Sequence, residues 1–154
     1  MRIIAGKHRG TQLADVGKGD ADAHLRPTSD RVRESLFSML THHNVINGAR
    51  VLDLFAGTGA LGLEALSRGA REVVFIENGR VGQKLITENI KKLLKINNKF
   101  YSSAPISVAI GAGVSEEGES IEAVIRRADL LMYARKQEYY DAKRKAGLGN
   151  LSAA

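Results

Sequence analysis

The chain has 154 residues, a formal net charge of +6 and no cysteine. Its length suffices for one domain with a hydrophobic core, and the lack of cysteine excludes disulfides, thiolate zinc sites and cysteine nucleophiles. No apolar run reaches membrane-spanning length and no charged-then-apolar leader is visible, so we expect a cytoplasmic protein without membrane contact. The positive charge permits a nucleic-acid partner without requiring one.

Residues 2–13 form a basic segment that predicts a small hairpin or arm. Its basic side chains include Arg2, Lys7 and Arg9. Two interpretations stay open at this point. The arm either contacts phosphates of a nucleic acid or is a solvated ribbon at the edge of the fold.

A helix is expected over 28–41, with Thr28 as its N-cap and acidic Asp30 in its first turn. Its apolar stripe follows helical spacing and consists of Val32, Leu36, Phe37 and Leu40. The pair of histidines at 42–43 has no partner ligands at a sensible spacing. We therefore expect a surface loop there and no metal site.

The most informative stretch is 51–62, where a short apolar run breaks into glycines at 57, 59 and 62 and continues as a helix over 60–68. A second apolar run, expected as a strand over 72–77, ends in Glu77. A strand, a glycine turn and a helix, followed about 20 residues later by an acid, indicate a nucleotide-type ligand whose ribose the acid binds. The alternative is an ordinary turn between strand and helix.

The acid at position 53 narrows the class of ligand that the glycine turn can bind. It lies in the strand end ahead of the glycines, where a carboxylate would repel a pyrophosphate but suits an ammonium or sulfonium charge. This chemistry favours S-adenosylmethionine, with Glu77 on its ribose. A further helix over 80–95 completes an alternation of strands and helices that is typical of a parallel sheet.

Four motifs carry a resemblance to a known family. They are Arg-Ile-Ile-Ala-Gly at 2–6, Arg-Pro-Thr-Ser-Asp-Arg-Val-Arg-Glu at 26–34, Asp-Leu-Phe-Ala-Gly-Thr-Gly-Ala-Leu-Gly-Leu-Glu-Ala at 53–65 and Val-Val-Phe-Ile-Glu at 73–77. Residues 1–90 thereby resemble the bacterial methyltransferases that modify the exocyclic N2 of a guanine in small-subunit ribosomal RNA.

The resemblance implies functional residues for this sequence. The candidate cofactor-binding residues are Asp53, Phe55, Gly57, Thr58, Gly59 and Glu77. Together with the arm, it places an RNA-facing side near Arg2, Lys7, Arg9, Arg26 and Thr28.

The family also needs Asn- or Asp-Pro-Pro-Tyr/Phe, which holds the guanine amine near the methyl group and stacks on the flipped base. This sequence has only two prolines, Pro27 and Pro105, far apart. We therefore assign no catalytic residue and expect no turnover. A working enzyme would need a substitute among Asn44, Asn78 and Asn97, none of which precedes a proline.

A second resemblance covers residues 90–140. Ile-Ser-Val-Ala-Ile-Gly at 106–111, with the Arg-Arg-Ala-Asp motif at 126–129, Met132, Tyr133 and Lys136, is similar to the C-terminal third of GGDEF-type diguanylate cyclases. The Gly-Gly-Asp/Glu-Glu-Phe turn of these cyclases is absent from the sequence, so cyclase activity is not expected. The simplest interpretation is an engineered or recombined chimera joined within 85–95.

The residues after 104 predict a strand over 105–111 and a helix over 120–139. We expect Ser120 as the N-cap of this helix. Its expected buried stripe is Ile121, Val124, Ile125, Ala128, Leu131 and Met132. A flexible basic tail over 141–154 should follow.

The predicted fold is one α/β domain over 1–154, a truncated Rossmann-like sheet with helices on its faces and the hairpin to one side. A poorly covered strand edge favours a homodimer. Three functions compete: a chimera without turnover that keeps a residual S-adenosylmethionine site, an active guanine-N2 methyltransferase, and a non-enzymatic RNA-binding module.

Overall fold

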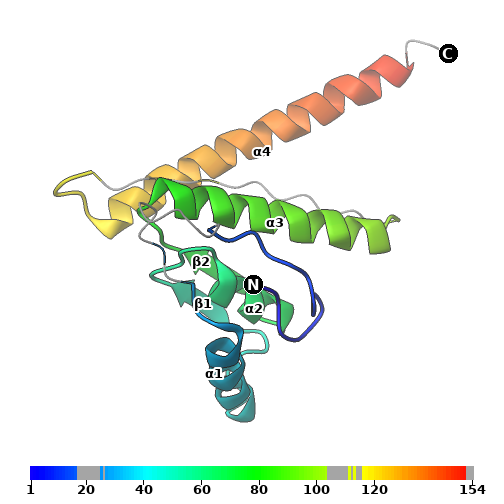
Figure 1. Ribbon diagram of the computed structural model, residues 1–154. Coiled ribbons are helices and arrows are strands. Elements are labelled where there is room, and N and C mark those ends of the chain that lie inside the picture. The colour runs from blue at the N-terminus through cyan, green and yellow to red at the C-terminus, as the bar shows by residue number, and fades with distance from the viewer. Residues whose placement is uncertain (17–24, 26, 104–110, 112, 114–115, 152–154) are drawn as a thin grey trace. The chain divides into compact units, whose positions relative to one another are not determined.

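The computed structural model describes residues 1–16, 25, 27–103, 111, 113 and 116–151. The chain divides into two compact units, Met1–Pro105 and Ile106–Ala154, whose elements are labelled in Figure 1. The single domain over 1–154 stays a prediction.

A parallel two-stranded sheet forms the centre of the first unit. Strand β1 (Arg50–Asp53) pairs with β2 (Glu72–Phe75), and Asp53 lies opposite Phe75 in the register. Helix α2 (Ala60–Ser67) connects the strands and packs on both of them, as Figure 1 shows. This confirms the predicted strand, helix and parallel strand. The third expected strand, 105–111, falls outside the described residues apart from Gly111, which is not in a strand.

Helix α1 (Asp30–His42) begins two residues after the predicted start at residue 28, and its N-cap lies one residue later than predicted. Its N-cap is Ser29, whose hydroxyl accepts a hydrogen bond from the Val32 N–H at 3.4 Å. The prediction of Thr28 as N-cap is therefore wrong. A capping oxygen accepts from an N–H two or three residues ahead, and Val32 lies three residues after Ser29 but four after Thr28. The expected apolar stripe also differs. Phe37 is buried as predicted, but Val32 is 56% exposed and Arg33 is buried instead.

Helix α3 (Arg80–Phe100) continues past the predicted end at residue 95. Its buried side includes Leu85, Ile86 and Leu93. Asn97, four residues after Leu93, continues this side, and no glycine or proline lies between Leu93 and Phe100.

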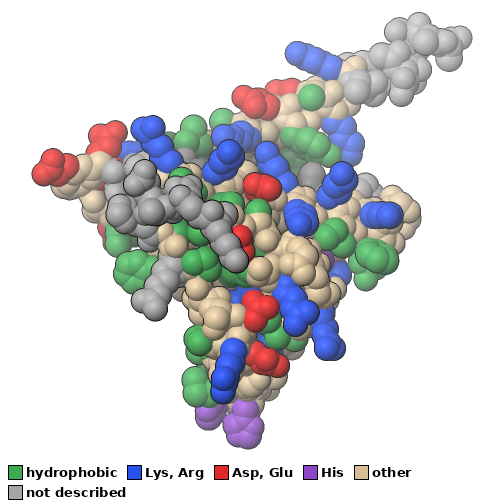
Figure 2. Space-filling view, viewed as in Figure 1, with side chains coloured by type: hydrophobic (Ala, Val, Ile, Leu, Met, Phe, Trp, Pro, Cys, Tyr) green, Lys and Arg blue, Asp and Glu red, His purple; other side chains and the backbone are tan. Residues whose placement is uncertain are grey.

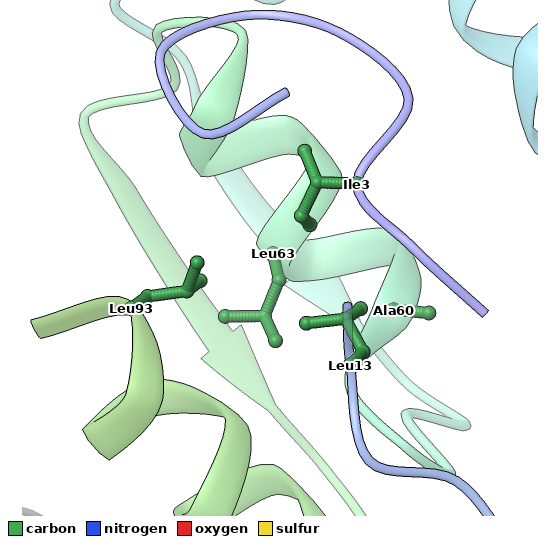
Figure 3. Packing of buried hydrophobic residues seen from close by; sticks show 5 residues of the cluster. All are labelled: Ile3, Leu13, Ala60, Leu63 and Leu93. Carbon is green, nitrogen blue, oxygen red and sulfur yellow. The ribbon is translucent and has the colours of Figure 1, made fainter. Parts of the chain in front are cut away.

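The N-terminal arm is a short hairpin, which confirms that prediction. Arg2 and Gln12 form an antiparallel bridge, and the Ile3 N–H donates to the Thr11 carbonyl at 3.0 Å. The arm is part of the core, because Ile3 and Leu13 are buried with residues of α2 and α3. This cluster consists of Ile3, Leu13, Ala60, Leu63 and Leu93 (Figure 3).

The second unit contains α4 (Ile121–Leu151). Ser120 precedes it as predicted, and its hydroxyl accepts from the Ala123 N–H at 3.3 Å. The helix runs beyond the predicted end near 139, since the segment 141–146 is rich in alanine, lysine and arginine, which favour helices. The expected flexibility of 141–154 stays a prediction.

The predicted stripe of α4 is only partly buried. Val124, Ala128 and Met132 are half-buried, whereas Ile121, Ile125 and Leu131 are exposed. Gly111 approaches this side so closely that a Cβ on it would lie 1.8 Å from the Ala128 carbonyl oxygen.

Among the helices of the described residues, none is long and apolar enough to cross a membrane. The predicted homodimer stays a prediction, which light scattering over a concentration series tests.

Candidate functional site

The glycine turn lies between the end of β1 and the start of α2, and Asp53 anchors it from within the fold. The Asp53 side chain is buried, and its Oδ2 accepts a hydrogen bond from the Gly62 N–H at 3.1 Å. Burial raises the pKa of this carboxyl, and the negative charge of Glu77 raises it further. Backbone hydrogen bonds from Gly62 and Phe55 oppose the shift. A cationic ligand would stabilise the ionised form.

The second carboxylate, Glu77, follows β2 and points back to the turn. Its Oε2 accepts from the Gly57 N–H at 2.7 Å, and its Oε1 accepts from the Gly79 N–H at 2.7 Å. Its carbonyl oxygen accepts from the Gln83 side chain at 2.9 Å. An ionised carboxylate has about four lone-pair sites. With the donors of the described residues counted, two acceptor sites therefore remain for donors from a ligand.

Glycine is required at two positions of this turn. Gly57 and Gly59 have φ angles of +53° and +78°, which L side chains rarely adopt. A Cβ on Gly59 would also lie 3.1 Å from Ile86 of α3. The turn thus brings its backbone close to α3 and places Gly59 at the N-terminus of α2.

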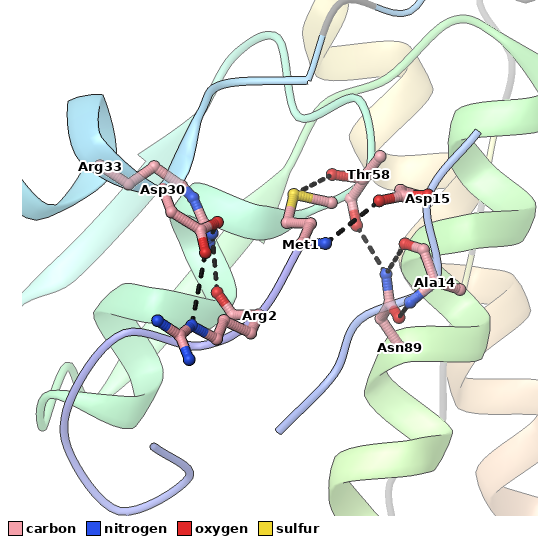
Figure 4. A network of polar contacts seen from close by, with 8 residues as sticks. All are labelled: Met1, Arg2, Ala14, Asp15, Asp30, Arg33, Thr58 and Asn89. Atoms are coloured by element: carbon pink, nitrogen blue, oxygen red, sulfur yellow. Dashed lines mark hydrogen bonds and ion pairs between the residues drawn. The ribbon is translucent and has the colours of Figure 1, made fainter. Parts of the chain in front are cut away.

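The other two predicted cofactor residues are placed differently. The Phe55 side chain is 91% exposed beside the turn. Thr58 is buried, and its hydroxyl lies 3.7 Å from the Met1 sulfur (Figure 4). The structure therefore joins Asp53, Glu77 and the glycine backbone by hydrogen bonds, while the Thr58 side chain faces the N-terminal arm.

A buried asparagine, which the sequence analysis missed, connects the arm to the turn. Asn89 of α3 accepts from the Ala14 N–H at 2.7 Å and donates to the Ala14 and Thr58 carbonyl oxygens, each at 3.0 Å (Figure 4). Its place on the buried side of α3, four residues after Leu85, is the one signal in the sequence that could have identified it.

A buried glutamate fixes the other end of the arm. Glu64 of α2 accepts from the Ile4 and Ala5 N–H groups at 2.7 and 3.0 Å and pairs with Arg68 at 2.7 Å. Ser67 of the same helix accepts from the His8 N–H at 3.0 Å. A charged residue between Leu63 and Ala65 in an apolar helix was the available signal.

The predicted RNA-facing residues have varied surroundings. Arg2 is 3.4 Å from Asp30, which also pairs with the buried Arg33 (Figure 4). Lys7 lies over the Tyr101 ring, 4.7 Å from its centre. Arg9 is exposed and Thr28 half-buried. Arg26 lies outside the described residues.

Figure 2 shows histidines at the C-terminal end of α1. His42 and His43 pack edge to face there and are both exposed. The described residues contain no group of three His, Cys, Asp or Glu side chains that could hold a metal ion.

Comparison with known proteins identifies the family. A family model described as Conserved hypothetical protein 95 matches residues 1–109. The chain belongs to this family. Ribosomal RNA small subunit methyltransferase D of Escherichia coli K12 is 39% identical over 127 residues, which is 82% of this chain and 61% of that protein. The protein of the same name from Haemophilus influenzae is 42% identical over 93 residues, 60% of this chain and 45% of that protein.

A solved structure agrees with the family. An Escherichia coli protein described as a putative methyltransferase, yhhF, is 43% identical, with a TM-score of 0.50 over 60% of this chain and 46% of its own. This confirms a methyltransferase-like α/β fold. The chain spans about half the length of the curated relatives it matches.

The matches also bear on the predicted chimera. The family model extends to residue 109, and the Escherichia coli relative, which covers 82% of the chain, extends beyond it. Methyltransferase similarity thus continues past residues 85–95, where we expected a join. The cyclase resemblance and the chimera are supported by none of these matches and stay predictions.

Proposed function

We propose that this chain binds S-adenosylmethionine at its glycine turn and acts in methylation of a guanine N2 in small-subunit ribosomal RNA. The observation that supports this best is the convergence of two carboxylates, Asp53 and Glu77, on the backbone of one glycine turn. The names of the relatives support the reaction class and the RNA substrate.

The residues at the turn fit the cofactor in three ways. The two remaining acceptor sites of Glu77 match the two O–H donors of a ribose diol. The Asp53 carboxylate favours the positive charge of the methionine part. The exposed Phe55 ring offers an apolar face to the adenine. When bound, the cofactor supplies a methyl group activated by its sulfonium charge, while the chain's residues hold and orient it.

The RNA would approach on the side of the arm. We propose contacts from Arg2, Lys7, Arg9, Arg26 and Thr28, because the first three are basic side chains of an arm that is anchored close to the turn. Phosphate contacts give a steep loss of affinity with added salt. Replacing Arg9 by alanine should reduce the slope of log affinity against log salt by roughly one, and an unchanged slope would remove Arg9 from the interface.

Methyl transfer by this chain alone needs a polar group that holds the guanine amine, since the sequence has no Pro-Pro segment. Among the three asparagines considered, Asn97 is buried and Asn44 lies two residues after the end of α1, whereas Asn78 is exposed directly beside Glu77. We therefore assign this role to Asn78. Transfer of labelled methyl groups to small-subunit ribosomal RNA that is lost in Asn78→Ala would support turnover. Cofactor binding without any methyl transfer would support the interpretation of the chain as a protein that keeps the cofactor site but has no turnover.

Calorimetric titration with S-adenosylhomocysteine tests the cofactor site. Phe55 and Phe100 are matched probes, because both rings are exposed, at 91% and 79%, and their truncation should leave the fold intact. Loss of one stacked ring should weaken binding roughly tenfold in Phe55→Ala, with no change in Phe100→Ala. No binding by the unmodified protein would refute the proposed function, and equal affinities of all three proteins would place the ligand elsewhere.

A further inference from the structure

A glycine in the first turn of α3 lies against the ribose-binding candidate. Gly82 is buried, and a Cβ on it would lie 2.6 Å from Cγ and 2.7 Å from Cδ of Glu77. The same Cβ would lie 2.8 Å from the carbonyl oxygen of Gly57. Real Cβ atoms essentially never approach other atoms this closely, so any larger residue would displace these groups.

Space, and not backbone conformation, is what requires glycine here. Gly82 is inside α3 and is not among the glycines with positive φ. Alanine is normally the better helix former at such a position. Glycine in place of alanine at position 82 is therefore explained by the close approach of α3 to Glu77 and to the glycine turn.

We infer that Gly82 is a positioning residue that sets the specificity of the site for ribose, an inference that rests on the proposed binding of S-adenosylmethionine. Hydrogen bonds from Gly57 and Gly79 fix the plane of the Glu77 carboxylate, and with it the direction of the two remaining acceptor sites. A methyl group at position 82 pushes Cγ and Cδ away and rotates that plane. The same methyl group also meets the carbonyl oxygen of Gly57, so a smaller loss of affinity common to ribose and deoxyribose compounds should accompany the loss of ribose preference.

The experiment compares S-adenosylhomocysteine with its 2′-deoxyribose analogue by calorimetry. A hydrogen bond to a charged group corresponds to about a 10- to 100-fold preference for the ribose compound in the unmodified protein. We expect Gly82→Ala to lower this preference to about threefold or less, with a smaller loss in affinity for the deoxy analogue. The control is Lys84→Ala, an exposed position two residues on in the same helix, which should keep the full preference.

Double substitution separates an effect through Glu77 from general damage. In a Glu77→Ala background the ribose preference is already lost, so adding Gly82→Ala should leave the ratio of the two affinities unchanged. If Gly82→Ala does not fold, recovery of folding in Gly82→Ala/Glu77→Ala supports the inference, because Glu77 is then the group that the new methyl contacts. Failure of this double variant to fold overturns the inference.

The remaining outcomes are distinct. Full ribose preference in a folded Gly82→Ala protein would overturn the role of Gly82 and leave the proposed cofactor binding intact. Absence of binding by the unmodified protein would overturn both.

Discussion

Replacing Glu64 by alanine should loosen the attachment of the N-terminal arm to α2. The carboxylate is fully buried and holds two backbone N–H groups of the arm as well as Arg68, whose side chain is 12% exposed. Breaking a buried ion pair by removing one partner costs about 3–5 kcal/mol, and each backbone N–H left without an acceptor costs about 1–3 kcal/mol if it stays buried. Because the arm can move and rehydrate its N–H groups, we expect a total loss of about 3–5 kcal/mol in the free energy of unfolding.

The matched control is Glu72→Ala. Glu72 pairs with Arg50 at 2.9 Å, but the two side chains are 47% and 71% exposed, and such surface pairs contribute about 0–1 kcal/mol. Urea denaturation followed by circular dichroism gives both losses, and hydrogen exchange at the Ile4 and Ala5 amides tests the cause. Similar losses in the two variants, or unchanged exchange at these amides in Glu64→Ala, would refute the reasoning.

Three further predictions concern the arm and the turn. Asn89→Ala removes the three hydrogen bonds of a buried side chain and should cost about 2–4 kcal/mol, with faster exchange of the Ala14 amide; protection like that of the unmodified protein would contradict it. Gly6→Ala and Gly10→Ala both place alanine at positive φ, near +80°, but only at Gly6 would the Cβ meet a neighbour, the Ser67 carbonyl oxygen at 1.9 Å. Gly10→Ala should therefore lose about 1 kcal/mol and Gly6→Ala clearly more, measured by thermal unfolding; equal losses would argue against tight docking of the arm. Burial raises the pKa of Asp53 above its ordinary value of 3.8, so the folded state holds this proton more tightly than the unfolded state. The resulting contribution to stability is present below that value and is lost as pH rises through the raised pKa. Asp53→Asn should accordingly gain stability relative to the unmodified protein as pH rises from about 4, and parallel pH profiles of the two proteins would contradict this.

The local elements of the first unit follow from short-range patterns. The apolar runs before Asp53 and Glu77 became β1 and β2, and the positive φ angles of Gly57 and Gly59 explain the glycines between them. The site was also predictable in outline, because parallel strands bring their carboxyl ends to one edge of the sheet. Glu77 therefore reaches Gly57 across 20 residues of sequence.

Contacts across longer distances were not predictable in this way. Glu64 lies about 60 residues from the arm that it holds, and Asn89 lies 75 residues from Ala14. Hydrophobic periodicity assigns buried positions to apolar residues, so it has no means of selecting a glutamate or an asparagine for them. The same limitation applied to Arg33, which is fully buried on α1 where the pattern favoured Val32.

The contacts of the arm show that its two sequence-based interpretations are compatible. Its backbone faces inward, where Glu64 and Ser67 of α2 and Asn89 of α3 satisfy its N–H groups. Arg2 and Arg9 face solvent on the same segment, with Arg2 60% exposed. A ribbon with a fixed backbone loses little further backbone entropy when its side chains bind phosphates. The attachment of the arm is therefore compatible with the RNA contact proposed above. Because Asn89 binds both Ala14 and Thr58, the same anchor also fixes the arm relative to the glycine turn.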